Sequence, residues 1–300
     1  MTRPEVRIYE VGPRDGLQAE ATVVSTDAKL TFVGMLANAG LHEIETTSLV
    51  SPRAIPQMAD ADELLHRLKR RPGVRYPVLV PNARGLERAV AADVDAICLI
   101  TAATDSYVQH NIGMGIDESL AAFEPIAAEA RRRGMWIRAY VSTAFGCPYE
   151  GEVDERAVVS VAERLLRLGV DELSISDTLG VAAPVDIARV LGALADGGIG
   201  ADVVALHLHD TRGTALANVM AAMELGVRCF DASAGGTGGS PYAPGSAGNL
   251  ATEDLVYLLD RQGVRSDVNL DGVLAAARFI ASQLGGELGS KVGRAGAWPQ

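Results

Sequence analysis

Two histidines separated by one residue, His207 and His209 in the stretch HLHD, are the strongest candidates for chemistry in this sequence. Residues two apart in a β-strand point to the same side, so both imidazoles would face one site. An H-x-H pair can bind a metal ion, although it is more often packed and hydrogen-bonded without one. Asp15 and Asn249 could add a carboxylate and an amide oxygen, leaving two positions of an octahedral ion for substrate oxygens. Because no thiolate is present, Mg²⁺ or Mn²⁺ is favoured over zinc.

Further polar residues are expected near the same site. Arg14 is either half of a surface ion pair or a guanidinium that stabilises negative charge on a carbonyl oxygen. Glu45 could orient Arg14 through a bidentate contact, and a solvated carboxylate at a strand end is the alternative. Asp210 follows the histidine pair on the opposite side of the strand, so we expect it to cap the next helix.

The elements that must position these residues form a repeating pattern. Eight short β-like runs alternate with longer helical patterns, at residues 6–10, 43–48, 76–81, 95–100, 136–142, 172–177, 203–209 and 228–234. This alternation predicts a parallel sheet with crossover helices. Eight such units in about 260 residues predict an α/β fold of the (β/α)8 TIM-barrel type. An open doubly wound sheet is the alternative, but EVGPRDGLQ after the first run is not its glycine-rich phosphate turn.

The barrel requires its chemistry at the C-terminal ends of the strands. Arg14 and Asp15 follow the first run, Glu45 lies near the end of the second, and Asp177 ends the sixth. The histidine pair ends the seventh run, and the glycine-rich stretch GGTGGSPYAPGSAGN (235–249) follows the eighth. That stretch is either a surface linker or a lid that approaches a ligand closely.

The domain organisation follows from the same pattern. We expect one catalytic domain over residues 1–285, with an extra C-terminal helix in DVNLDGVLAAARFIASQL (267–284) that packs on the barrel. Residues 286–300 are typical of a mobile C-terminal tail.

Composition excludes several classes of partner. The 300 residues are 48% hydrophobic and 22% charged, as is ordinary for a globular protein. A net charge of −11 opposes contact with nucleic acid or anionic lipid. No apolar run reaches membrane-spanning length, and MTRPEVRIYEVG lacks the apolar core of a secretory signal, so we expect a cytoplasmic protein.

A family resemblance covers nearly the whole chain, from about residue 5 to about residue 290. The sequence closely resembles the 3-hydroxy-3-methylglutaryl-CoA lyase family, of the metal-dependent lyase and Claisen-condensing barrel superfamily. The resemblance lies in EVGPRDGLQAE, IETTSLVSP, GCPYEG, SDTLG, HLHDTRGTALAN and GGSPYAPGSAGNLATEDLVYLL. It implies retro-Claisen cleavage of a 3-hydroxy-3-methylglutaryl thioester to acetyl-CoA and acetoacetate.

The resemblance also implies roles for single residues. The implied ligands of Mg²⁺ or Mn²⁺ are Asp15, His207, His209 and Asn249. Either Asp15, or Asp177 through a water, would remove the proton of the substrate hydroxyl, and Arg14 would steady the departing enolate. A helix cap is the alternative for Asp177. We expect Arg53, Lys291 and Arg294 to contact the phosphates of CoA, and the resemblance implies a homodimer or another homo-oligomer.

The sequence departs from the resemblance at Ser240, where the family's glycine loop carries a catalytic cysteine. An alcohol is several pKa units less acidic than a thiol, whose pKa is about 8.5, so serine cannot readily ionise. The chain could be a slower lyase that relays a proton through the hydroxyl, an enzyme for a related 3-hydroxyacyl-CoA, or a weakly active acyl-CoA binder. We favour a lyase of altered efficiency or substrate. The nearest enzymatic alternatives are Claisen condensation of acetyl-CoA with a 2-oxo acid and aldol cleavage of a 4-hydroxy-2-oxo acid.

Overall fold

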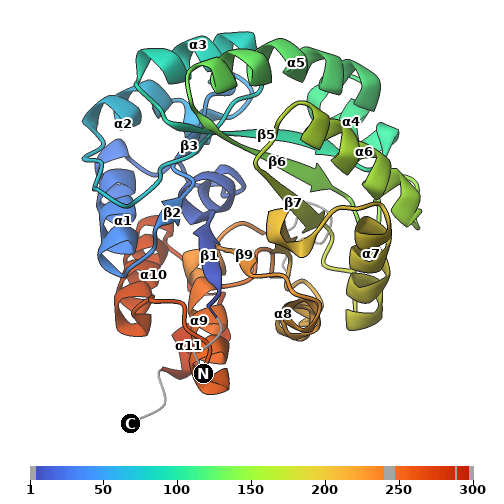
Figure 1. Ribbon diagram of the computed structural model, residues 1–300. Helices are drawn as coiled ribbons and strands as arrows, with labels where there is room; N and C mark the ends of the chain where they lie inside the picture. Colours follow the sequence, from blue (N-terminus) through green and yellow to red (C-terminus); the bar gives the residue numbers. More distant parts are fainter. Residues whose placement is uncertain (1–4, 240–246, 288, 297–300) are drawn as a thin grey trace.

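Parallel strands form a closed barrel at the centre of the molecule (Figure 1). The computed structural model describes residues 5–239, 247–287 and 289–296. Its strands are β1 (Arg7–Glu10), β2 (Glu43–Ile44), β3 (Thr47–Ser48), β4 (Val78–Leu79), β5 (Ala96–Ala102), β6 (Trp136–Ser142), β7 (Glu172–Asp177), β8 (Val204–Leu208) and β9 (Cys229–Ala232). They are hydrogen-bonded in the order β2-β1-β9-β8-β7-β6-β5-β4-β3. Because β2 and β3 belong to one extended segment, the sheet closes on itself, as the predicted barrel requires.

The segment 43–48 differs from its prediction as a single strand. It pairs first with β1 and then with β4, so it is divided into β2 and β3. Between them, the Glu45 amide donates to the Glu10 carbonyl at 2.8 Å and the Thr46 amide to the Pro77 carbonyl at 3.0 Å. The predicted run 76–81 is also shorter, because Pro77 and Pro81 flank β4 and cannot donate to a ladder.

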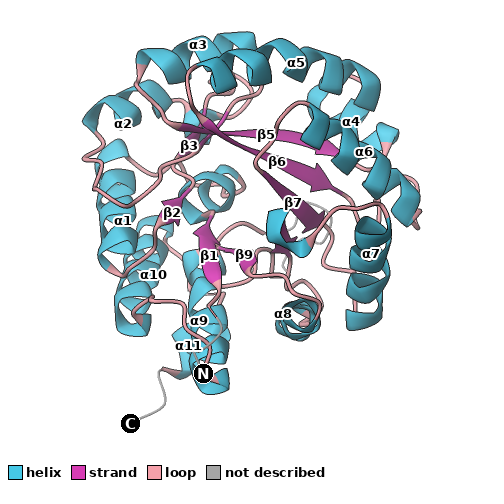
Figure 2. Ribbon diagram, in the orientation of Figure 1, coloured by secondary structure: helices cyan, strands magenta, loops and turns pink. Residues whose placement is uncertain are grey.

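Helices surround the barrel on its outer side (Figure 2). They are α1 (Thr26–Asn38), α2 (Ala61–Arg67), α3 (Ala83–Ala91), α4 (Asp105–Ile112), α5 (Ile116–Arg132), α6 (Glu155–Arg167), α7 (Pro184–Asp196), α8 (Ala215–Glu224), α9 (Thr252–Gln262), α10 (Leu270–Leu284) and α11 (Lys291–Ala295). Side-chain caps define several starts: Ser25 accepts from the Ala28 amide, and Asn269 accepts from the Gly272 amide. None of the described helices is long and apolar enough to cross a membrane.

The C-terminal region matches one prediction and corrects another. The predicted extra helix is α10, which packs against α1 and α9. The prediction of a mobile tail is wrong for residues 290–295, which are held against the start of α9. The Ser290 hydroxyl donates to Glu253 at 2.5 Å, and the Val292 amide donates to Asp254 at 2.7 Å. The helical pattern of this five-residue element is too short to recognise in the sequence, and its partners are carboxylates rather than apolar side chains.

The barrel interior is unusually polar. Interiors of this fold are typically filled by branched apolar side chains. Here Tyr9, Cys98 and Tyr140 form part of a small apolar cluster. Beside it lie three charged residues that are buried to at least 97%: Arg138, Glu172 and Asp231. Buried charges require partners, and these connect to the residues at the C-terminal end of the barrel.

Candidate metal centre and active site

Asp15, His207 and His209 meet where strands β1 and β8 end. Each offers one ligand atom, and these atoms all lie within 4.8 Å of one another. In the described part of the chain, this is the one group of three or more His, Cys, Asp or Glu residues with such spacing. Asp15 lies in a π-helical turn, Gly12–Gly16, that directly follows β1. Such turns are rare and occur frequently at functional sites.

Asn249 is brought to the same place by pairing with strand β8. It forms a β-bridge with His209, and the neighbouring Leu250 amide donates to the Leu208 carbonyl at 3.0 Å. The Asn249 side-chain amide then donates to Asp15 Oδ2 at 2.8 Å. All four residues expected to bind a metal therefore gather at one site.

Their protonation states suit a divalent cation. Burial raises the pKa of Asp15, but Arg14 and the two imidazoles outweigh it and lower that pKa to about 2. Burial, assisted by His207, lowers the pKa of His209 to about 3. Metal ligands must be deprotonated, so an ionised carboxylate and a neutral imidazole fit this requirement. His209 Nδ1 is also buried without a hydrogen-bond partner among the described residues, a cost that a bound ligand would relieve.

Arg14 is buried beside this group, which excludes the surface ion pair. Its side chain donates from Nε to Glu45 Oε1 at 2.5 Å and from Nη1 to Asp15 Oδ1 at 2.7 Å. Arg14 is 2% exposed and Glu45 is 0% exposed, so Glu45 is not a solvated strand-end carboxylate. The Tyr140 hydroxyl donates to the other oxygen of Glu45. These contacts hold the guanidinium beside Asp15, His207 and His209, which we call the metal group.

Two aspartates next to the site accept hydrogen bonds from backbone amides. Asp177 accepts from the Val181 and Ala182 amides, each at 3.0 Å, and thereby orders the loop before α7. Burial raises the pKa of Asp177 above its ordinary value. Asp210 accepts from the amide of Ala215, the first residue of α8, at 3.1 Å, so it satisfies a helix-start amide as expected, although the N-cap position itself is Thr214.

The residues expected to contact CoA lie in two places. Arg53 is exposed in the turn at residues 52–54. The Lys291 ammonium pairs with Asp210, the residue after His209, and Arg294 donates to the Ser290 carbonyl at 3.2 Å. Ser240 lies outside the described residues.

Sequence reasoning missed the residues beneath the site. His207 and Asp231 are register partners in the adjacent strands β8 and β9, and His207 Nδ1 lies 3.1 Å from Asp231 Oδ2. Arg138 makes paired contacts to Asp231 at 2.5 and 3.0 Å. The one available signal was a charged residue inside each apolar run, WIRAYVS and RCFDASA.

Glu10 also went unnoticed, although it ties three parts of the site together. Its carboxylate accepts from the Gly12 and Ala234 amides, each at 2.9 Å, and from the Thr252 hydroxyl at 2.6 Å. It thus connects the turn that carries Asp15, the start of the glycine-rich stretch and helix α9.

The Glu10 carboxyl should make stability depend on pH. Burial raises its pKa to about 7 from the ordinary 4.5, so the folded state binds the proton more tightly than the unfolded state. The contribution of Glu10 to the free energy of unfolding should therefore be fully present below pH 4.5 and should be lost, by about 3 kcal/mol, as pH rises to about 7. The free energy of unfolding can be measured by urea titration across this pH range. The pH-dependent loss should disappear in Glu10→Gln and remain in the exposed control Glu87→Gln. Equal slopes in both variants would contradict the assignment.

Comparison with known proteins agrees with this geometry. The sequence profile of the HMGL-like family matches residues 5–280. The chain is 45% identical to the mitochondrial hydroxymethylglutaryl-CoA lyase of Bos taurus, over 97% of this chain and 89% of the relative. The crystal structure of the Bacillus subtilis HMG-CoA lyase superposes with a TM-score of 0.96 at 43% identity, covering 98% of this chain and 99% of that one.

A second solved structure is an HMG-CoA lyase from Acinetobacter baumannii in complex with coenzyme A and 3-methylmalate. It is similar with a TM-score of 0.92 at 37% identity, over 99% of this chain and 98% of that chain. Family profile, relatives and solved structures agree over nearly the full length. The chain belongs to the HMGL-like family, as its resemblance led us to expect.

Proposed function

We propose that this protein is a hydroxymethylglutaryl-CoA lyase, a carbon–carbon lyase that cleaves a 3-hydroxy-3-methylglutaryl-CoA-type thioester to acetyl-CoA and acetoacetate. The observation that carries the proposal is the Asp15, His207 and His209 group with Arg14 in contact with Asp15 at 2.7 Å. Relatives of about 44% identity with this activity in their names support it. A related lyase with bound coenzyme A supports an acyl-CoA substrate.

Asp15, His207, His209 and the Asn249 amide would hold Mg²⁺ or Mn²⁺ in this enzyme. Such an ion is a Lewis acid that makes a coordinated alcohol more acidic. Asp15 keeps its negative charge across the physiological range because its pKa is about 2. His207 lies in β8 and His209 directly follows it, so the barrel wall would hold both imidazoles in place before substrate enters.

The reaction balances without an oxidant or a second substrate. The hydroxyl on the tertiary carbon loses its proton, and the bond from that carbon to the methylene beside the thioester breaks. The electron pair passes into the thioester as an enolate, and the former hydroxyl carbon becomes the ketone of acetoacetate. A proton added to the enolate carbon gives the methyl group of acetyl-CoA.

Arg14 would stabilise the enolate oxygen. Glu45 and Asp15 hold its guanidinium from two sides, so little reorganisation is needed as charge develops. Between the two carboxylates considered as the base, Asp177 is favoured, because burial raises its pKa while that of Asp15 is lowered. Since both Asp177 oxygens accept backbone amides, its proton transfer would pass through a water. The role of Ser240 stays a prediction.

The function is tested by incubating the protein with Mg²⁺ or Mn²⁺ and each candidate substrate. We expect acetoacetate and acetyl-CoA from 3-hydroxy-3-methylglutaryl-CoA. Release of free CoA from acetyl-CoA and a 2-oxo acid would support a condensing enzyme, and pyruvate from a 4-hydroxy-2-oxo acid would support an aldolase. Saturable acyl-CoA binding without any product would identify a binder. The homodimer and the cytoplasmic location stay predictions.

The proposed CoA contacts predict a change in KM alone. Lys291→Met should raise KM for the thioester about tenfold with kcat nearly unchanged, because a charge-assisted contact to a remote phosphate binds substrate and transition state equally. Arg53→Met and Arg294→Met test the other two positions in the same steady-state assay. A fall in kcat without a rise in KM would instead show that Lys291 acts by holding Asp210 and, through it, the neighbouring His209.

A further inference from the structure

Arg138 is a cation enclosed in the middle of the barrel, with no exposure to solvent. It lies on β6, and its register partner on β7 is Glu172. Arg138 Nε donates to Glu172 at 2.9 Å, while its two terminal nitrogens donate to Asp231 at 2.5 and 3.0 Å. Its guanidinium also lies over the Tyr9 ring, 3.8 Å from the centroid. Nε, both terminal nitrogens and one face of the guanidinium are therefore each in contact with a partner.

Asp231 joins Arg138 to the metal group. Besides the arginine, it accepts from the Ser174 hydroxyl at 3.1 Å and contacts His207 Nδ1 at 3.1 Å. A carboxylate at this position makes Nδ1 the protonated nitrogen of a neutral imidazole. The lone pair is then on Nε2, the nitrogen left for a metal.

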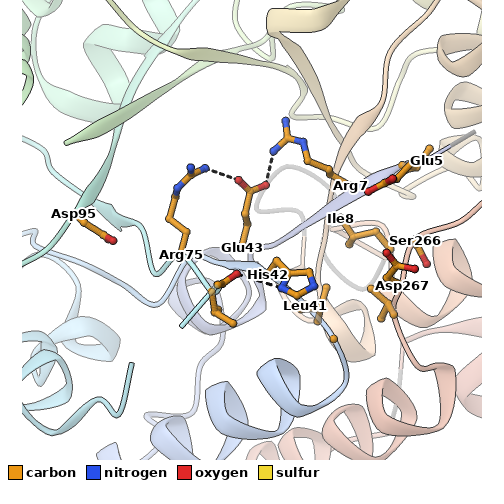
Figure 3. Close-up of a pocket in the computed structure, with 15 residues that line it drawn as sticks. Glu5, Arg7, Ile8, Leu41, His42, Glu43, Arg75, Asp95, Ser266 and Asp267 are labelled. Atoms are coloured by element: carbon orange, nitrogen blue, oxygen red, sulfur yellow. Dashed lines mark hydrogen bonds and ion pairs between the residues drawn. The ribbon is translucent and has the colours of Figure 1, made fainter. Parts of the chain in front are cut away.

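The second carboxylate partner of Arg138, Glu172, is connected to charged residues at the opposite end of the barrel. Glu172 also pairs with Arg7, and Arg7 donates to Glu43 at 2.5 Å. Figure 3 shows Arg7 and Arg75 pointing at Glu43 from two sides, at the wall of a cavity of about 450 Å³ near the start of β1. Alternating charges thus run through the barrel from this cavity to His207.

We propose that Asp231 and Arg138 are positioning residues for the metal centre, and that they fix both the tautomer and the orientation of the His207 ring. This inference rests on the proposed metal-dependent function. It adds that the affinity for the cation depends on a carboxylate and an arginine that do not touch it. Among the described residues, the hydrogen-bond acceptors of the Arg138 guanidinium are Glu172, Asp231 and the Tyr140 hydroxyl.

The test is the dissociation constant for Mn²⁺, measured by electron paramagnetic resonance without substrate. Asp231→Asn should weaken binding about 10- to 100-fold, the usual loss when the hydrogen-bond partner of a metal-binding histidine is changed. The matched control is Asp60→Asn, the same substitution at a carboxylate paired with the buried Lys29 at 2.5 Å outside the barrel. The control should bind Mn²⁺ like the parent protein even if its thermal stability falls.

Two milder variants keep the proposal testable if Asp231→Asn does not fold. Ser174→Ala removes one hydrogen bond to Asp231 and should weaken Mn²⁺ binding a few-fold. Arg138→Lys keeps the charge but lacks the planar fork that reaches Glu172 and both oxygens of Asp231 at once, so it should lower affinity more than Ser174→Ala does. Parent-like Mn²⁺ affinity in the folded variants would overturn the proposal. Because no substrate is used, weakened Mn²⁺ binding supports it even if the parent protein fails to cleave the thioester.

Discussion

Replacing His207 with alanine should lower kcat/KM for thioester cleavage by at least about 10³-fold, because a Lewis acid supplies several kcal/mol of transition-state stabilisation. The variant should also fail to gain thermal stability when Mn²⁺ is added. His207 is one of three residues whose ligand atoms lie within 4.8 Å, and its loss leaves Asp15 and His209 as an incomplete set. Steady-state kinetics and thermal unfolding with and without Mn²⁺ provide the measurement.

The matched control is His42→Ala, at an exposed histidine that lines the cavity near the start of β1 (Figure 3). This substitution should leave kcat/KM and the Mn²⁺-induced stabilisation unchanged. Activity in His207→Ala within a few-fold of the parent protein would exclude the histidine pair as the metal site.

Replacing Arg14 should slow thioester cleavage almost as much as replacing His207 does, and the change should appear in kcat. Removing one preorganised donor to a developing oxyanion typically costs about 10²- to 10³-fold in kcat. We expect a loss of that size in Arg14→Lys, because lysine cannot contact Glu45 and Asp15 at the same time from a rigid fork. KM should change little, since the contact strengthens only in the transition state.

Arg88→Lys is a matched control for that experiment. Arg88 also forms an ion pair, from its Nε to Asp62 Oδ1 at 2.9 Å, but it joins α3 to α2 on the outside of the barrel. Its kinetics should equal those of the parent protein. A higher KM with normal kcat in Arg14→Lys would show that Arg14 binds the substrate's ground state instead.

Much of the fold could be predicted from the sequence because each strand has a local hydrophobic pattern. The runs 136–142 and 172–177 match β6 and β7 residue for residue. Placing chemistry at strand ends then predicted which residues would meet, and Asp15, His207, His209 and Asn249 do gather there. Spacing within one strand and position at a strand end are enough for this, because a closed parallel barrel brings all C-terminal ends to one face.

The contacts that could not be predicted from the sequence depend on pairing between strands that are distant in the chain. Asp231 faces His207 because β8 and β9 are in register, and Arg138 reaches Asp231 across the barrel. No local pattern gives a register or an interior packing layer. The division of 43–48 into two strands has the same origin, since it follows from a change of neighbour that only the closed sheet imposes.

The metal site is tested most directly by anomalous diffraction from crystals soaked in Mn²⁺. We expect a single strong peak in contact with the side chains of Asp15, His207, His209 and Asn249. A peak elsewhere on the protein, or none at a concentration that supports turnover, would contradict it.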